Sequence, residues 1–434
     1  MRAWPWVVGL GLALVEAALL WSQPDPEPQG PPRWTSYDLG PSHDAVFHPF
    51  QGPAVSFRVL LPGGVVGGVS VVGHRIYGSG LDGSVFALAS GNGKLLWVHK
   101  LPNAVFDPPT VLGDRLFVGI GNDVFQRIGG RYWIRGTPPS GIYALKASNG
   151  QLLWSHPTRG NDKTSPLFDP QTGWLYEPDG DHWLRALRPD GRLVWKVNDE
   201  GLDDFSFPTE VGGRLYVNTG SALHPALRAF SARTGKLLWS YASTNADNTP
   251  TYGAGRFLVV NTLPFQPQPK GPKLLAEVFQ GVDLNGRLRW RYMTRPGPYP
   301  PAFQAPAATY RGGVFYITSS VRPYLYAFQA RSGRLLYKTR LPGVAYDNPT
   351  VAGPWIFEAT LQGELLVLRR KDGKILKEVP LGGQVGAGGM TLIDNTLYVG
   401  LIEGTPATIV SGGAPKGALV ALALPKLLAG LPVQ

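Results

Sequence analysis

The chain has no cysteine among its 434 residues. This excludes disulfide bonds, thiolate metal sites, covalently attached c-type haem and a cysteine nucleophile. It also excludes a lipid anchor on an N-terminal cysteine. Because thiols are missing, cysteine usage does not indicate the redox compartment in which the protein works.

The sequence also lacks the short motifs of common catalytic sites. It contains no G-x-S-x-G nucleophile elbow, no H-E-x-x-H zinc helix, no P-loop and no dinucleotide-binding fingerprint between a strand and a helix. His43 and His48 have no third ligand nearby, so they do not indicate a metal pair. Enzyme chemistry therefore has no direct support in a motif.

Long runs of one charge are missing as well, although the net charge is +11 at pH 7. No basic run exceeds Arg369-Arg370-Lys371. Such scattered charge is typical of a solvated basic surface, and attraction to anionic lipid or to an anionic partner is the alternative. No nucleic-acid motif accompanies the charge, so we expect no nucleic-acid partner.

A short segment that recurs seven times organises the chain. Its first copy reads ALASGNGKLLW at residues 87–97, and a later one reads AFSARTGKLLW at residues 229–239. The copies end at Trp97, Trp154, Trp195, Trp239, Trp290, Tyr337 and Lys377, so successive ends lie 40 to 57 residues apart. Self-similarity at about this period signals a propeller or a solenoid.

Each copy has the pattern of two strands joined by a tight turn. An apolar run such as Val85-Phe86-Ala87-Leu88 predicts a strand, and the polar cluster ending in glycine suits a hairpin turn that needs positive φ. A second apolar strand then ends in the aromatic residue. Another strand lies upstream, as at Arg214-Leu215-Tyr216-Val217, and a Pro-Thr pair usually precedes it. Four strands per repeat predict one propeller blade.

Seven complete blades are predicted, and the chain ends supply an eighth. The seven cover residues 65–101, 108–158, 165–197, 207–241, 249–294, 305–341 and 348–381. Residues 389–424 supply three strands without a fourth, and the apolar strand at 54–60 has no blade of its own. Pairing the two ends would remove free sheet edges. The predicted fold class is all-β: an eight-bladed β-propeller of four-stranded antiparallel blades, with its ring closed by an N-terminal strand and preceded by an N-terminal hydrophobic helix.

The repeat resembles that of pyrroloquinoline-quinone (PQQ) propellers, whose docking motif runs Ala-x-Asp-x-x-Thr-Gly-Lys-x-x-Trp. The Ala, Gly and Trp positions match over residues 54–424. The Asp of the motif is replaced in the 11-residue copies, which have Ala89, Lys146, Ser231, Gln329 and Arg369 there. The aromatic ends are predicted to dock against neighbouring blades, a structural role for Trp97, Trp154, Trp195, Trp239, Trp290 and Tyr337.

The N-terminus is predicted to direct the chain to a membrane. Residues 4–21 are apolar apart from Glu16 and are just long enough to span a bilayer, with Trp4 and Trp21 at the two ends. The bulky Leu19-Leu20-Trp21 favours an uncleaved signal anchor over a cleaved signal peptide. Four segments are thus predicted: a signal anchor or peptide (1–22), a Pro-rich linker (23–53), the propeller (54–424) and a C-terminal tail (425–434). The propeller is expected outside the cytoplasm, periplasmic or at the cell surface.

Loops on one face of the predicted ring are the candidate site. The long insertions at 119–140, 262–276 and 401–417 fall between the second and third strands of their blades. The loops from the fourth strand to the next blade reach the same face near the axis. Those loops carry acidic or amide residues that would ring the channel mouth: Asp107, Asp162, Asp204, Asp247, Asn248, Gln304, Asp347 and Asn348. Such a ring is expected to bind a cation or a basic ligand, and turn capping by the same side chains is the alternative.

Two functions from different classes follow from these patterns. In size, blade number and tethering, the chain is similar to the propeller lipoprotein of the outer-membrane barrel-assembly machinery, which implies a non-catalytic scaffold with protein partners in the envelope. It departs from that lipoprotein in having no cysteine to acylate. The alternative is a PQQ- or metal-dependent oxidoreductase. The resemblance implies that PQQ and Ca²⁺ sit at the axis of such enzymes, but no insertion here carries their ligand set, so we expect no cofactor.

Overall fold

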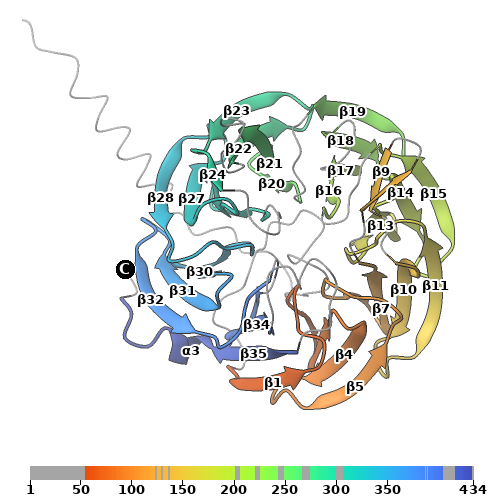
Figure 1. The fold of residues 1–434 in the computed structure, drawn as a ribbon, viewed down its shortest axis with the longest axis horizontal. Helices are drawn as coiled ribbons and strands as arrows, with labels where there is room; N and C mark the ends of the chain where they lie inside the picture. Colours follow the sequence, from red (N-terminus) through yellow and green to blue (C-terminus); the bar gives the residue numbers. More distant parts are fainter. Residues whose placement is uncertain are drawn as a thin grey trace, which may run out of the picture.

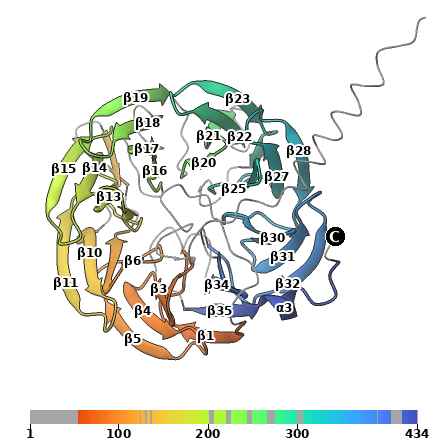
Figure 2. The same ribbon diagram turned by 180° about the vertical axis from the view of Figure 1, so that it is seen from behind.

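The computed structural model describes residues 54–432, except 123–124, 129–130, 135–136, 201–205, 220–224, 243–248, 266–273, 299–305, 387, 389 and 404–415. Side chains are also left undescribed at 123–136, 258–273 and 298. The described residues form a ring of eight antiparallel sheets around a central axis (Figure 1). The short first strands of the blades, such as β6, β16, β20 and β25, lie nearest the centre (Figure 2). The predicted all-β, eight-bladed architecture is confirmed.

Seven blades run in chain order from the innermost to the outermost strand. Blade 1 has β2 (Ser70–Val72), β3 (Arg75–Ser79), β4 (Ser84–Ala89) and β5 (Leu95–Lys100). Blade 2 has β6 (Thr110–Leu112), β7 (Arg115–Ile120), β10 (Ser140–Lys146) and β11 (Leu152–Thr158). Blade 3 has β12 (Leu167–Asp169), β13 (Trp174–Pro178), β14 (Trp183–Leu187) and β15 (Leu193–Asn198). Blade 4 has β16 (Thr209–Val211), β17 (Arg214–Thr219), β18 (Ala226–Ser231) and β19 (Leu237–Ala242).

The remaining blades follow the same order. Blade 5 has β20 (Thr251–Gly253), β21 (Arg256–Phe265), β22 (Leu274–Asp283) and β23 (Leu288–Met293). Blade 6 has β25 (Thr309–Arg311), β26 (Val314–Thr318), β27 (Tyr324–Gln329) and β28 (Leu335–Arg340). Blade 7 has β29 (Thr350–Ala352), β30 (Trp355–Ala359), β31 (Glu364–Arg369) and β32 (Ile375–Pro380).

Blade 8 combines strands from both ends of the described chain. It contains β33 (Met390–Ile393), β34 (Thr396–Ile402) and β35 (Gly417–Ala423), with β1 (Phe57–Leu61) as its outermost strand. β1 pairs with β35 in antiparallel register from Phe57↔Ala421 to Leu61↔Gly417. Thr391 on β33 also exchanges hydrogen bonds with the backbone of Val69, beside blade 1. These contacts bring the N-terminal strand and the last blade together, as the apolar pattern at 54–60 predicted.

The motif aromatics join each blade to the next one. The indole Nε1 of Trp97 donates a hydrogen bond to the Ala147 carbonyl oxygen at 3.1 Å, and Trp195 donates to the Ala232 carbonyl oxygen at the same distance. Trp154, Trp239 and Trp290 bond to the next blade in the same way, and so does the Tyr337 hydroxyl. Each ring also lies over a turn glycine of the next repeat, so that a Cβ on Gly150 would be 2.6 Å from Trp97. The aromatics therefore have the inter-blade packing role that the motif implied.

Two of the three insertions predicted as loops contain strands. Residues 119–140 include a hairpin of β8 (Phe125–Ile128) and β9 (Arg131–Ile134). In blade 5, β21 and β22 extend as a ribbon whose last pair is Phe265↔Leu274, and β24 (Gly297–Pro298) pairs with β22. The loop predictions at these two places were wrong in detail. An insertion between two antiparallel strands can satisfy its backbone by prolonging their ladder, as in blade 5, or by forming a hairpin of its own, as in blade 2. Most of the third insertion, 404–415, lies outside the described residues.

The chain ends differ in how far they are described. The predicted tail begins with a short helix, α3 (Leu424–Leu427), whose Leu424 and Leu427 are buried against blades 7 and 8. The predicted N-terminal helix (4–21) and the Pro-rich linker up to residue 53 lie outside the described residues. Within the described part of the chain, no helix has the length and apolarity needed to cross a bilayer.

Candidate functional site

Four of the eight residues predicted to ring the channel mouth are described, and all four are buried. Asp107 lies between β5 and β6, Asp162 between β11 and β12, and Asp347 and Asn348 between β28 and β29. Their exposed fractions are 9%, 0%, 2% and 5%, in that order. The other four, Asp204, Asp247, Asn248 and Gln304, lie outside the described residues. Buried groups of this kind can hold a small ion, but a macromolecular surface cannot reach them.

The loops that carry these residues pack on one another across the axis. Phe106, from the loop before blade 2, shares an apolar cluster with Tyr346, from the loop before blade 7, and with Val66 beside blade 1. The ammonium group of Lys163 lies over the Phe106 ring, 4.9 Å from its centroid. Asp347 Oδ1 accepts a hydrogen bond from the Asn348 backbone N–H at 2.8 Å, as in a turn cap. At these loops the mouth is filled by side chains, which explains why the acidic groups are buried.

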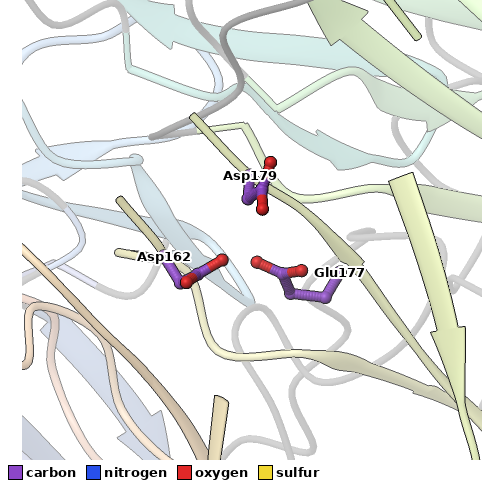
Figure 3. A group of neighbouring side chains, drawn as sticks. All are labelled: Asp162, Glu177 and Asp179. Atoms are coloured by element: carbon purple, nitrogen blue, oxygen red, sulfur yellow. The ribbon is translucent and has the colours of Figure 1, made fainter. Parts of the chain in front are cut away.

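The densest group of acidic side chains lies in blade 3 and the loop before it. Asp162, from that loop, faces Glu177 on β13 and Asp179, which follows β13 directly (Figure 3). One carboxylate oxygen from each residue lies within 4.8 Å of the others. All three side chains are fully buried. Their closeness follows from topology, because the loop entering a blade and the turn after its second strand reach the same face.

Arg185 is the cation of this cluster. It lies on β14 directly opposite Glu177, in a strand pair of matched register. Its guanidinium hydrogen-bonds Asp179 and lies 3.2 Å from an oxygen of Asp181. Its distance to Glu177 Oε2 is 3.6 Å, which is beyond hydrogen-bonding range. One guanidinium is therefore shared among several carboxylates.

The acidic groups of this face have raised pKa values because they are buried. Burial raises the pKa of Asp162 to about 6 and that of Asp107 to about 8. The pKa values of Glu177 and Asp179 lie well above their usual range, first through burial and then through neighbouring carboxyl groups. Burial disfavours the charged form of a carboxyl group. Such groups suit proton transfer near neutral pH or the binding of a positive ion.

Two further buried carboxyl groups lie on the same face, in blades 5 and 7. Glu277 on β22 accepts hydrogen bonds from Ser320, at 3.0 Å from its backbone N–H and 2.9 Å from its hydroxyl, and from the Ser319 hydroxyl. Burial raises the pKa of Glu277 to about 7. Glu358 on β30 has a pKa well above its usual range through burial and through the charge of Asp347.

Sequence reasoning identified Asp162 but missed Glu177, Asp179, Arg185 and Glu277. A signal for one of them existed. Glu177 and Glu358 occupy the same register position in the second strand of their blades, one residue after the pairing partner of the motif Ala or Val. Other blades place small or apolar residues there: Gly78, Val118, Val217, Ile317 and Val399. A charged residue at a position that is small or apolar in other blades does not stabilise the core. It therefore marks a candidate functional site.

A family model described as outer membrane protein assembly factor BamB matches residues 18–131, 180–339 and 277–401, more than half of the chain. The chain belongs to this family of PQQ-like propellers. It is 25% identical to tetrathionate hydrolase of Acidithiobacillus ferrooxidans, over 76% of this chain and 70% of that protein. It is 26% identical to quinohemoprotein alcohol dehydrogenase ADH IIB of Pseudomonas putida, over 42% of this chain but only 26% of that enzyme. The crystal structure of quinohemoprotein alcohol dehydrogenase from Comamonas testosteroni superposes with a TM-score of 0.64 at 14% identity, covering 95% of this chain and 84% of that one, which shows the shared fold.

The described part of the mouth carries more acidic than basic side chains. The quinone PQQ carries several carboxylates, so its site must supply positive charge and hydrogen-bond donors. Among the described residues around the mouth, Arg185 on β14 is held by Asp179 and Asp181, and Lys163 faces Asp107 and Phe106. Around them Asp107, Asp162 and Glu177 place buried carboxyl groups. The donor set favours a cation over an anionic quinone.

Proposed function

We propose that this protein is a non-catalytic propeller of the cell envelope that binds a partner protein on the outer strand of blade 1. The observation that carries the proposal is the apolar surface of β5. Leu95, Leu96 and Val98 are 49%, 44% and 55% exposed on this strand, and β5 is the outermost strand of its sheet. An exposed apolar patch at a free strand edge favours a protein interaction.

Other outer strands differ from β5 in the residue at the position equivalent to Val98. The motif leucines are exposed in several blades, as at Leu152 and Leu153 or Leu237 and Leu238. Val98 lies one residue after the motif Trp, where β11 has Ser155 and β19 has Ser240. Leu60, 74% exposed on the neighbouring outer strand β1, adds apolar surface beside blade 1 (Figure 1). The membership of an assembly-factor family supports the same proposal.

The place of the patch suits a protein tethered to a membrane. The chain enters the propeller through β1, immediately after the predicted linker (23–53) and anchor (4–21). A Pro-rich linker acts as a stiff spacer, so the entry point lies at the end of the tether. We propose that the propeller is held outside the cytoplasmic membrane with blades 8 and 1 at the point of attachment. Mass spectrometry of the mature N-terminus would distinguish the anchor from a cleaved signal peptide.

Site-specific photocrosslinking tests the scaffold function. A photoreactive amino acid at Val98 is expected to give a defined adduct with one envelope protein, and Leu96→Asp is expected to abolish that adduct. The matched control is the same probe at Ser240, the equivalent position on β19 in blade 4. The absence of an adduct from position 98, or the same adducts from both positions, would contradict the proposal.

A hydrolase is the second candidate, favoured by the match to tetrathionate hydrolase over most of both chains. Glu277 supports it chemically, because a carboxyl group with a pKa of about 7 beside Ser319 and Ser320 is suited to proton transfer. The test is loss of tetrathionate from solution on incubation with the purified protein between pH 3 and 8. Turnover by the wild type that Glu277→Gln reduces at least tenfold would favour the hydrolase over the scaffold.

A further inference from the structure

Asp162, Glu177 and Asp179 bring three carboxylates to one point inside the protein, where neither the scaffold nor the hydrolase proposal uses them (Figure 3). We propose that these three side chains form a Ca²⁺ site in blade 3. The site is independent of the proposed partner surface, which lies on the outer strand of blade 1.

Carboxylate oxygens in this cluster are left without donors. Apart from the contact in which the carboxyl groups of Asp162 and Glu177 can share a proton, neither oxygen of Glu177 receives a hydrogen bond, and Oδ1 of Asp162 receives none, although all three atoms are buried. The second oxygen of Asp162 accepts a hydrogen bond from the Thr158 hydroxyl, and Asp179 is bonded by Arg185 and by the Asp181 backbone N–H at 2.9 Å. A buried carboxylate without hydrogen bonds or a counter-ion is strongly unfavourable. The carboxyl groups of Asp162 and Glu177 face one another, and a cation bound between them would take the place of the proton that they share (Figure 3).

Charge balance favours a cation once the carboxyl groups are ionised. Asp162, Glu177, Asp179 and Asp181 are four carboxyl groups, and Arg185 supplies one guanidinium, so three negative charges remain when all are ionised. The nearby Lys163 turns to the Phe106 ring and to Asp107. A divalent ion would reduce the excess to one and would coordinate the oxygens that Arg185 does not reach.

The ligand type and the spacing favour calcium. Hard divalent cations prefer carboxylate oxygens, and Ca²⁺ binds them at about 2.3 to 2.6 Å in irregular arrangements. Two oxygens on opposite sides of Ca²⁺ are thus at most about 5.2 Å apart, which accommodates three oxygens within 4.8 Å of one another. Mg²⁺ requires a nearly ideal octahedron at about 2.0 to 2.1 Å and keeps several waters, which a fully buried cluster of protein carboxylates does not suit.

Blade 7 provides a matched control inside the same molecule. Glu358 is in the same register position as Glu177 and is also fully buried. The residue opposite Glu358 is Leu366 in place of Arg185, and no group of three carboxylates surrounds it among the described residues. Glu177→Gln and Glu358→Gln therefore remove the same chemical group from equivalent places, and only the first removes a proposed ligand.

The experiment is calorimetric titration of CaCl₂ into the full-length protein, purified in detergent and stripped with EDTA. We expect one Ca²⁺ per chain and at least a tenfold loss of affinity in Glu177→Gln and in Asp162→Asn, with Glu358→Gln unchanged. The melting temperature provides a second readout, because an ion that binds only the folded state stabilises it in proportion to its concentration. Ca²⁺ should raise the wild-type melting temperature but not that of Glu177→Gln. Without Ca²⁺, Glu177→Gln should melt no lower than the wild type, because the substitution removes a buried carboxyl group that the neighbouring carboxyl groups repel.

Three results would overturn the inference. The first is that folded wild-type protein gives no binding signal with Ca²⁺. The second is that Glu177→Gln binds as tightly as the wild type, or that Glu358→Gln loses as much affinity as Glu177→Gln. The third is tighter binding of Mg²⁺ than of Ca²⁺, which would overturn the calcium assignment.

Discussion

The ring of Phe57 packs over Gly93 so closely that a Cβ on this glycine would lie 2.6 Å from it. Trp97 has the same relationship to Gly150 in the next blade, and Trp154 has it to Gly191. Phe57 pairs with Ala421 on β35 as Trp97 pairs with Ala87 on β4. Phe57 is therefore the inter-blade aromatic of blade 8, supplied by the strand that comes first in the chain.

Truncating Phe57 should loosen the contact between blade 8 and blade 1. We expect Phe57→Ala to lower the free energy of unfolding by about 3 kcal/mol, the low end of the range for a buried phenylalanine, because this ring is partly exposed. Phe57→Trp restores the aromatic of the other blades and should cost less than about 1 kcal/mol. Urea unfolding followed by tryptophan fluorescence measures both. Equal stability of Phe57→Ala and wild type would show that β1 does not hold the blades together.

The turn glycines should divide into two classes according to what lies above them. Gly235 and Gly212 both have positive φ, at 68° and 62°, but a Cβ on Gly235 would lie 2.7 Å from Trp195, while nothing lies within 4 Å of one on Gly212. Alanine costs about 1 to 2 kcal/mol at either position through backbone strain. Gly235→Ala should cost about 1 to 3 kcal/mol more through overpacking. Thermal unfolding of the two variants tests this, and equal melting temperatures would contradict it.

Glu277 should make stability fall as the pH rises. Its folded pKa of about 7 lies above the ordinary value of 4.5, so the folded state binds the proton more tightly than the unfolded state does. The contribution of Glu277 is therefore fully present below about pH 4.5 and is lost as the pH rises through 7. Relative to wild type, Glu277→Gln should gain on the order of 3 kcal/mol between pH 4 and pH 8. Denaturant unfolding at both pH values measures the difference, and a gap that does not change with pH would disprove the assignment.

Arg185 and Arg228 should differ in cost although they occupy the same register position in blades 3 and 4. Arg185 is held among buried carboxyl groups, whereas Arg228 pairs with Glu200, whose side chain is 62% exposed. Removing one partner of a buried ion pair costs about 3 to 5 kcal/mol. Arg185→Leu should therefore unfold more easily than Arg228→Leu by at least about 2 kcal/mol at neutral pH. Calorimetric melting in EDTA makes the comparison, which similar losses in both variants would refute.

Much of the fold is readable from local sequence, because each blade is built from neighbouring segments. Alternating apolar residues and turn glycines such as Gly93 and Gly150 recur along the chain, and terminal aromatics such as Trp97 recur in most repeats, so strand order and blade number follow from them. The ribbon of β21 and β22 was not readable, since residues 262–276 carry no clear alternation. The candidate site was predicted only in part, as Asp162 without Glu177 and Asp179.

The sequence by itself determined the number of blades, the inter-blade role of the aromatics and the use of a first strand to complete the last blade, because each depends on a local pattern or on a simple count. Only the tertiary structure decided which polar residues meet. Asp162, Glu177 and Arg185 lie on different segments, and their burial depends on how the axial loops fill the mouth around Phe106 and Tyr346. Burial and charge pairing are set by all neighbours of a group in space, so no short stretch of sequence contains them.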